Sequence, residues 1–184
     1  MVNLIKNNLK KINIYLQPSN PSLAIMEGAV LFGIKPSTIN IRKAKYTIGK
    51  GICMDWDDKK HSGKGEKFFF EEFNTYLCKN CFEKFIEINQ DLKYEESISK
   101  KSYINKGHKK IIMEFYKTRK VNPIFIFEEG ITKIGECILD IDKIYENLKD
   151  RTIKTTMKFG GTFIDVTAIH LTSGKSVKTT LTFD

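Results

Sequence analysis

Two cysteines stand close together in Cys78-Lys79-Asn80-Cys81, and thiols at this spacing can hold a zinc ion or act as a redox pair. A structural zinc site needs four ligands, however, and the sequence contains no second paired spacing. The other cysteines and histidines are scattered along the chain: Cys53, Cys137, His61, His108 and His170. Aromatic and aliphatic neighbours favour small apolar packing for the pair, so the sequence predicts free thiols and no metal ligand.

The remaining polar residues form no catalytic pattern. His108 and His170 have no nucleophile at a diagnostic spacing and are interpreted as surface residues. Gly63-Lys64-Gly65 lacks the preceding strand and the following helix of a phosphate-binding loop. Four carboxylates that stand in pairs are assigned to strand ends and turns: Glu128, Glu129, Asp140 and Asp142. No catalytic and no cofactor-binding residue is predicted.

Composition limits the class of protein. The 184 residues are 41% hydrophobic, which suffices for an ordinary core, and 31 basic against 22 acidic residues give a net charge of +9. Because the lysines are spread along the chain, a solvated surface is favoured over a nucleic-acid site. No apolar stretch approaches the ~18 residues of a membrane span, and no secretion signal is recognisable. The sequence predicts a cytoplasmic protein without a membrane partner.

The elements that must carry any site are mostly strands. Residues 153–159, 164–168 and 177–183 alternate between apolar and polar types, and Gly160-Gly161 and Ser173-Gly174 supply the turns between them. Upstream, further short apolar segments include 111–116, 124–127 after Pro123, and 135–141. Together these patterns predict a mainly β protein with a two-sheet antiparallel β-sandwich from about residue 39 onward.

The N-terminal part has a different pattern. Helical spacing of apolar residues predicts a short helix at 3–11, followed by a strand at 12–15. After a proline-containing break, Ser22 is placed to cap a second, apolar helix that runs toward Gly33.

That second helix carries a family resemblance. The run Asn20-Pro21-Ser22-Leu23-Ala24-Ile25-Met26-Glu27-Gly28-Ala29-Val30 resembles the end of the actin-like ATPase domain of the 70-kDa heat-shock chaperones. Val30-Leu31-Phe32-Gly33 looks most like the divergent, 12-like branch of that family. Tyr46-Thr47-Ile48-Gly49 falls where the family begins its substrate-binding β-sandwich, and residues 153–183 resemble the final meander of that domain.

The resemblance implies a division of the chain into three parts. Residues 1–34 resemble a C-terminal remnant of the ATPase domain, 35–45 a linker with a first strand, and 46–184 a substrate-binding-like β-sandwich with an insertion at about 55–77. The family's phosphate-binding turns have no counterpart here, and Ser22 stands where typical members have Asp. ATP, which the full-length relatives bind, is therefore not expected to bind this chain, and no enzymatic activity is expected.

The resemblance also implies a function. Family members bind extended hydrophobic peptides in a channel between two loops, through main-chain hydrogen bonds and an apolar pocket. Carried over by position, the peptide-binding residues are Ile52, Cys53, Tyr103, Ile104, Ile111 and Met113. Ile104 precedes the polar loop 105–108, so the fold should tolerate a charge there, whereas Met113 could equally belong to the core.

Two functional hypotheses follow. The first is chaperone-type binding of unfolded or extended hydrophobic polypeptides, with co-chaperones as further partners. The alternative is a basic β-sandwich module that binds protein or nucleic acid and whose peptide channel is vestigial. The two differ in salt dependence, because phosphate contacts through lysines weaken steeply as salt rises and apolar contacts do not.

Overall fold

The computed structural model describes residues 21–35, 41–159 and 163–182 and contains two compact units, residues 1–39 and 40–184. The helix predicted at 3–11, the strand predicted at 12–15 and the turn at Gly160-Gly161 lie outside the described residues.

The described part of the first unit is one helix, α2 (Pro21–Ile34). Proline suits the first helical turn, since its fixed φ fits there and its missing N–H has no helical partner. The helix thus begins before Ser22, and the expected capping role of Ser22 is wrong. Large apolar side chains are exposed along α2: Leu23, Ile25, Met26, Val30, Leu31 and Ile34. Within the described ranges, no helix has both the length and the apolar character needed to cross a membrane.

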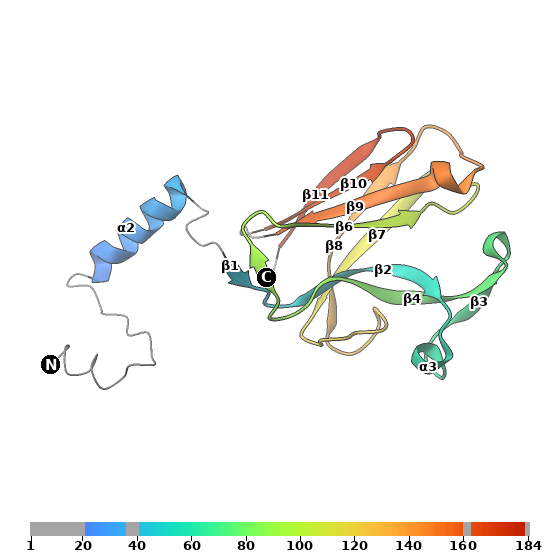
Figure 1. Ribbon diagram of the computed structural model, residues 1–184, viewed down its shortest axis with the longest axis horizontal. Coiled ribbons are helices and arrows are strands. Elements are labelled where there is room, and N and C mark those ends of the chain that lie inside the picture. The colour runs from blue at the N-terminus through green and yellow to red at the C-terminus, as the bar shows by residue number, and fades with distance from the viewer. Residues whose placement is uncertain (1–20, 36–40, 160–162, 183–184) are drawn as a thin grey trace. The chain divides into compact units, whose positions relative to one another are not determined.

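The second unit is a β-sandwich whose paired strands are all antiparallel (Figure 1), which confirms the predicted fold class. One sheet has the order β3-β4-β2-β7-β8, and the other has the order β11-β10-β9-β6. The first sheet contains β2 (Thr47–Asp55), β3 (Lys67–Phe70), β4 (Thr75–Ile86), β7 (Lys110–Thr118) and β8 (Ile131–Asp140). The second contains β6 (Ser97–Tyr103), β9 (Thr152–Lys158), β10 (Ile164–His170) and β11 (Ser176–Leu181). A small ribbon pairs β1 (Ile41–Lys43) with β5 (Asp91–Lys93).

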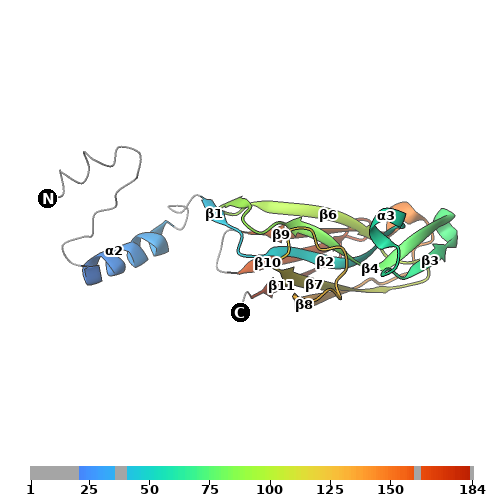
Figure 2. The ribbon, with the colours of Figure 1, turned by 90° about the horizontal axis from the view of Figure 1, so that it is seen from below.

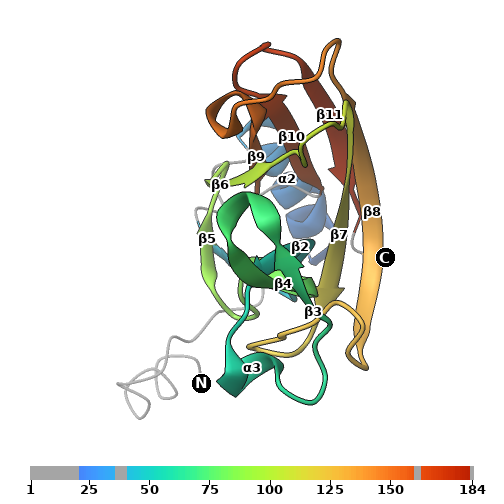
Figure 3. The same cartoon turned by 90° about the vertical axis from the view of Figure 1, so that its right-hand side faces the viewer.

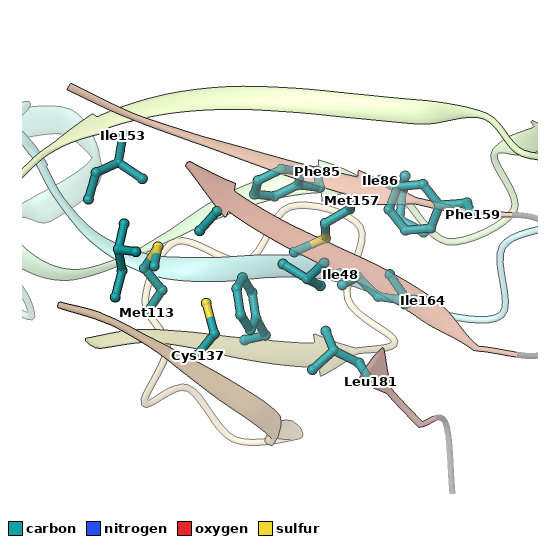
Figure 4. Packing of buried hydrophobic residues seen from close by; sticks show 14 of the residues in the cluster. Ile48, Phe85, Ile86, Met113, Cys137, Ile153, Met157, Phe159, Ile164 and Leu181 are labelled. Carbon is teal, nitrogen blue, oxygen red and sulfur yellow. The ribbon is translucent and has the colours of Figure 1, made fainter. Parts of the chain in front are cut away.

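The alternating patterns place one face of each strand in the core. In β9, Ile153, Thr155 and Met157 are buried whereas Lys154 is exposed, as a period of two requires. The main core lies between the sheets (Figure 4), where Ile48 from the first sheet lies in one cluster with Ile164 from the second. Burying each such side chain contributes about 1.5–3 kcal/mol to stability.

Segment 124–127 is not a strand, contrary to the prediction. Glu128 Oε1 accepts hydrogen bonds from the N–H groups of Ile124 (2.7 Å) and Phe125 (2.9 Å), which fixes a compact loop. An isolated bridge between Cys81 and Phe125 joins this loop to the sheet, with hydrogen bonds from Phe82 N–H to Ile124 O (2.8 Å) and from Ile126 N–H to Asn80 O (2.9 Å). The following strand, β8, begins at Ile131, earlier than the predicted residue 135.

His170 is buried, and its expected surface position is wrong. Its Nδ1 lies 2.8 Å from Ser173 Oγ, and its ring lies 4.8 Å from that of Tyr145, centroid to centroid. His170 follows Ile164, Val166 and Ala168 on the buried face of β10, which encloses its ring, and its Nε2 has no hydrogen-bond partner among the described residues.

The predicted insertion forms ordered structure between β2 and β4. It contains α3 (Asp58–His61), β3 and a 3-10 turn, η2 (Glu71–Phe73). Figures 1 and 2 both place α3 and β3 at the end of the sandwich opposite β1. A further 3-10 turn, η3 (Leu148–Arg151), precedes β9.

Candidate functional site: a cavity where one sheet divides

The five-stranded sheet divides where β2 and β7 separate from each other, partway along both strands. The register between these strands pairs Thr47 with Thr118 and ends at Lys50 with Phe115. Beyond this point β2 continues to Asp55 paired with β4, while β7 is paired with β8 back to Lys110. The two arms run apart from each other (Figures 1 and 3).

A cavity of about 610 Å³ opens at this division. Its lining comes from both arms, from the end of β6, from the insertion and from η3. All six residues that the sequence assigned to peptide binding line this cavity: Ile52, Cys53, Tyr103, Ile104, Ile111 and Met113. The structure therefore brings the whole predicted set together, while their contact with a peptide stays a prediction.

These six residues differ in accessibility. Tyr103 (47% exposed) and Cys53 are exposed and form part of the rim. Ile104 and Met113 are only 1% and 4% exposed and belong to the main core. The backbone N–H of Ile104 donates to Arg151 O (3.0 Å), and Arg151 Nη1 donates back to Ile104 O (3.0 Å). The expectation that the fold would tolerate a charge at position 104 is therefore wrong, because that side chain is held in the core.

Sequence reasoning missed several walls of the cavity. Phe70, Phe73 and Leu77 from the insertion line it, as does Ile112 from β7. The insertion has no clear counterpart in the family pattern, so the resemblance gave no residues there. Its aromatic run Phe68-Phe69-Phe70 was the available signal, since exposed apolar side chains on a polar insertion commonly mark a binding surface.

Charged pairs stand at the base of the cavity. Lys50 is 1% exposed, and its Nζ lies 3.3 Å from Glu83 Oε2. Burial lowers the pKa of Lys50 below its ordinary value, while the Glu83 carboxylate acts in the opposite direction. Arg151, also buried, pairs with Glu72 and so ties η3 to the insertion. The Lys50–Glu83 pair lies within the β2–β4 arm, whereas the Arg151–Glu72 pair joins two separate segments of the lining.

A second, smaller apolar cluster lies beside the insertion. Cys78, Cys81 and Phe125 are buried in it, and Met54 and Trp56 pack against them. All four cysteines of the chain are free. Burial and the neighbouring Cys78 raise the pKa of Cys81 to about 12, so this thiol lacks the lowered pKa of a redox-active cysteine.

Comparisons with known proteins show what the chain is similar to. No protein-family model matches it. Over 170 residues it is 34% identical to heat shock 70 kDa protein 12A of Mus musculus and 33% identical to the same protein of Homo sapiens. Over 175 residues it is 27% identical to human heat shock 70 kDa protein 12B. Each match covers 90% of this chain. The chain is related to the 12-like branch of the 70-kDa heat-shock proteins.

The relationship confirms the resemblance drawn from the sequence motifs and links the chain to a chaperone family. The chain spans about a quarter of the length of these heat shock 70 kDa relatives, since each match covers 25% of the relative.

Proposed function

We propose that this chain binds extended apolar peptide segments in the cavity between the diverging arms of β2 and β7. One observation carries the proposal: the sheet divides at Lys50 and Phe115, and apolar side chains line both sides of the opening. A binding channel for an extended chain needs these two features, strand edges and apolar walls.

The strand edges would supply affinity without regard to peptide sequence. A strand that leaves its partner has backbone N–H and C=O groups that another extended chain can pair with. The β2 arm beyond Lys50 covers Gly51 to Asp55, and the β7 arm covers Lys110 to Glu114. At roughly 3.3 Å per residue, each arm is long enough for about five residues of an extended peptide.

The cavity walls would supply selection for apolar side chains. The rim residues Tyr103 and Ile112 are 47% and 54% exposed, and the aromatic residues of the insertion stand near them in the lining. Covering such side chains removes apolar area from water at about 25 cal/mol per Å². Unfolded or extended hydrophobic polypeptides, with co-chaperones as further partners in the cytoplasm, are the partners that fit this proposal. No nucleotide takes part in this step.

Binding to an immobilised peptide array at two salt concentrations tests this function. Capture of extended apolar peptides that changes little with salt supports the proposal. Binding that favours acidic or nucleic-acid probes and weakens steeply with salt would instead support the alternative basic interaction module.

A further inference from the structure

The cluster beside the insertion brings three metal-ligating side chains together. His61, Cys78 and Cys81 are all buried, and their ligand atoms lie within 4.8 Å of one another. Cys81 Sγ is 3.9 Å from His61 Nε2. The sequence separates His61 from the cysteines by the whole of β3, which is why spacing alone classed it as scattered.

The local backbone is built to hold these side chains in place. Asp57 caps α3 by accepting the N–H of Lys59 on its side chain, and His61 ends that helix. The chain then turns so that Gly65 N–H donates to His61 O (2.7 Å), and a Cβ at Gly65 would lie 2.7 Å from Cys78 Sγ. Only glycine fits this close approach without displacing the thiol.

The cysteine pair lies on a local distortion of β4. Asn80 has a positive φ of 58°, and the register between β2 and β4 shifts in the same region, between Ile52 and Met54. A bulge of this kind allows two cysteines three positions apart to face the same side, which strict strand alternation forbids.

We propose that His61, Cys78 and Cys81 bind a thiophilic divalent cation, with Zn²⁺ as the best fit. Two sulfur donors and one imidazole are the ligand types that zinc prefers. Zn–S bonds of about 2.3 Å and Zn–N bonds of about 2.0 Å give tetrahedral edges of roughly 3.5 to 3.8 Å between ligand atoms. Since the ligand atoms lie within 4.8 Å of one another, the cluster reaches these edges by contracting by at most about 1.3 Å. Three protein ligands leave a fourth position, which a water molecule fills.

Zinc binding would change the protonation of all three ligands. His61 Nδ1 accepts the N–H of Asp57 (3.0 Å), so in the metal-free state the imidazole proton is on Nε2. On binding, each thiol releases its proton, and the Nε2 proton is replaced by one on Nδ1. The hydrogen bond from Asp57 must then open, which moves the peptide group between Trp56 and Asp57.

The site would join the insertion to the central sheet. His61 belongs to the insertion, the two cysteines lie on β4, and Leu77, next to Cys78, lines the cavity. A bound ion would hold α3 against β4 and so stabilise one wall of the cavity. The site itself does not depend on peptide binding.

Metal content and cobalt spectroscopy test the proposal. The whole chain, purified reduced with zinc supplied and excess removed, is expected to hold about one zinc ion. Titration with Co²⁺ is expected to produce a thiolate-to-cobalt charge-transfer band. It should also quench fluorescence from Trp56, the one tryptophan of the chain, whose ring lies 5.5 Å from that of His61.

Matched variants assign the ligands. Cys81→Ser and His61→Gln should each weaken zinc affinity by at least about 100-fold. Loss of a residue that only hydrogen-bonds to a ligand costs about 10- to 100-fold, so a larger loss identifies a direct ligand. His108→Gln, at an exposed histidine outside the trio, is the matched control for His61→Gln and should bind zinc like the parent. Should Cys81→Ser fail to fold, the cobalt spectrum of the parent still shows whether cysteine thiolates bind the metal. A folded, reduced parent with no zinc and no charge-transfer band, or equal loss of zinc in His108→Gln, would overturn the proposal.

Discussion

Lys50 and Phe115 are the last register partners between β2 and β7, and both side chains are buried where the sheet divides. The aromatic ring belongs to the main core, whereas the ammonium group faces Glu83 across 3.3 Å. A buried charge is costly unless it is paired. Replacing only one residue of this ion pair should therefore destabilise the fold at the base of the cavity.

Breaking that pair should destabilise the sandwich. Glu83→Gln leaves Lys50 buried beside a neutral amide, and we expect a loss of about 3 kcal/mol in the free energy of unfolding. The double variant Lys50→Met and Glu83→Gln removes both charges and should recover most of that loss. Urea unfolding measures both, and a single variant as stable as the parent would show that the pair carries no structural role.

The loop before β8 should depend on pH through Glu128. Burial opposes ionisation of this carboxyl, but hydrogen bonds from Lys120 and from the N–H groups of Phe125 and Ile124 prevail and lower its pKa. Stability from a lowered carboxyl pKa is present above the ordinary glutamate value of about 4.3 and is lost as pH falls through the folded-state pKa.

Glu128→Gln tests this dependence. The variant should lose about 1–2 kcal/mol at neutral pH, because charge-assisted hydrogen bonds are replaced by weaker ones. Its stability should also fall less than that of the parent in the acid range. Unfolding curves collected at neutral and acid pH give the comparison, and parallel pH profiles would contradict the assignment.

ATP should have no effect on this chain. A ligand that binds only the folded protein raises its apparent stability by mass action. We expect no shift of the melting temperature with Mg²⁺-ATP and no hydrolysis, because the sequence lacks the phosphate-binding turns of the family. A concentration-dependent rise in melting temperature would contradict this expectation.

Removing residues 1–34 should leave the sandwich folded. Residues 1–39 form one compact unit and 40–184 another, and α2 exposes apolar side chains such as Ile25 and Ile34. Exposed apolar surface promotes association, so the shortened chain should be more soluble. Circular dichroism and light scattering measure the two effects, and loss of the β signal would show that the segment supports the core.

Much of the fold could be predicted from the sequence because its strands have one buried and one solvent-exposed face. The alternation in β9, β10 and β11 follows directly from burial of one side, as Met157 and Lys154 illustrate. Segment 124–127 has the composition of a strand but is a loop, because Glu128 takes the backbone N–H groups that a ladder would need. Side-chain capping of this kind is not visible in apolar patterning.

The cavity was predictable only in part. The family resemblance located the six residues assigned to peptide binding, yet it could not show that Ile104 is buried by mutual hydrogen bonds with Arg151. Nor could spacing predict that His61 meets Cys78 and Cys81, because that contact depends on how the insertion folds back onto β4. Both misses come from long-range contacts, which local sequence does not encode.

Binding of fluorescent apolar peptides to Ile112→Glu and Ile138→Glu tests the central claim most directly. These two isoleucines are register partners on β7 and β8 and are 54% and 40% exposed, so the fold should tolerate either charge. Only Ile112 lines the cavity. We predict that Ile112→Glu weakens peptide binding at least about tenfold, since a charge replaces apolar contact, whereas Ile138→Glu binds like the parent. Equal binding by both variants, or a parent that binds no peptide, would contradict the account.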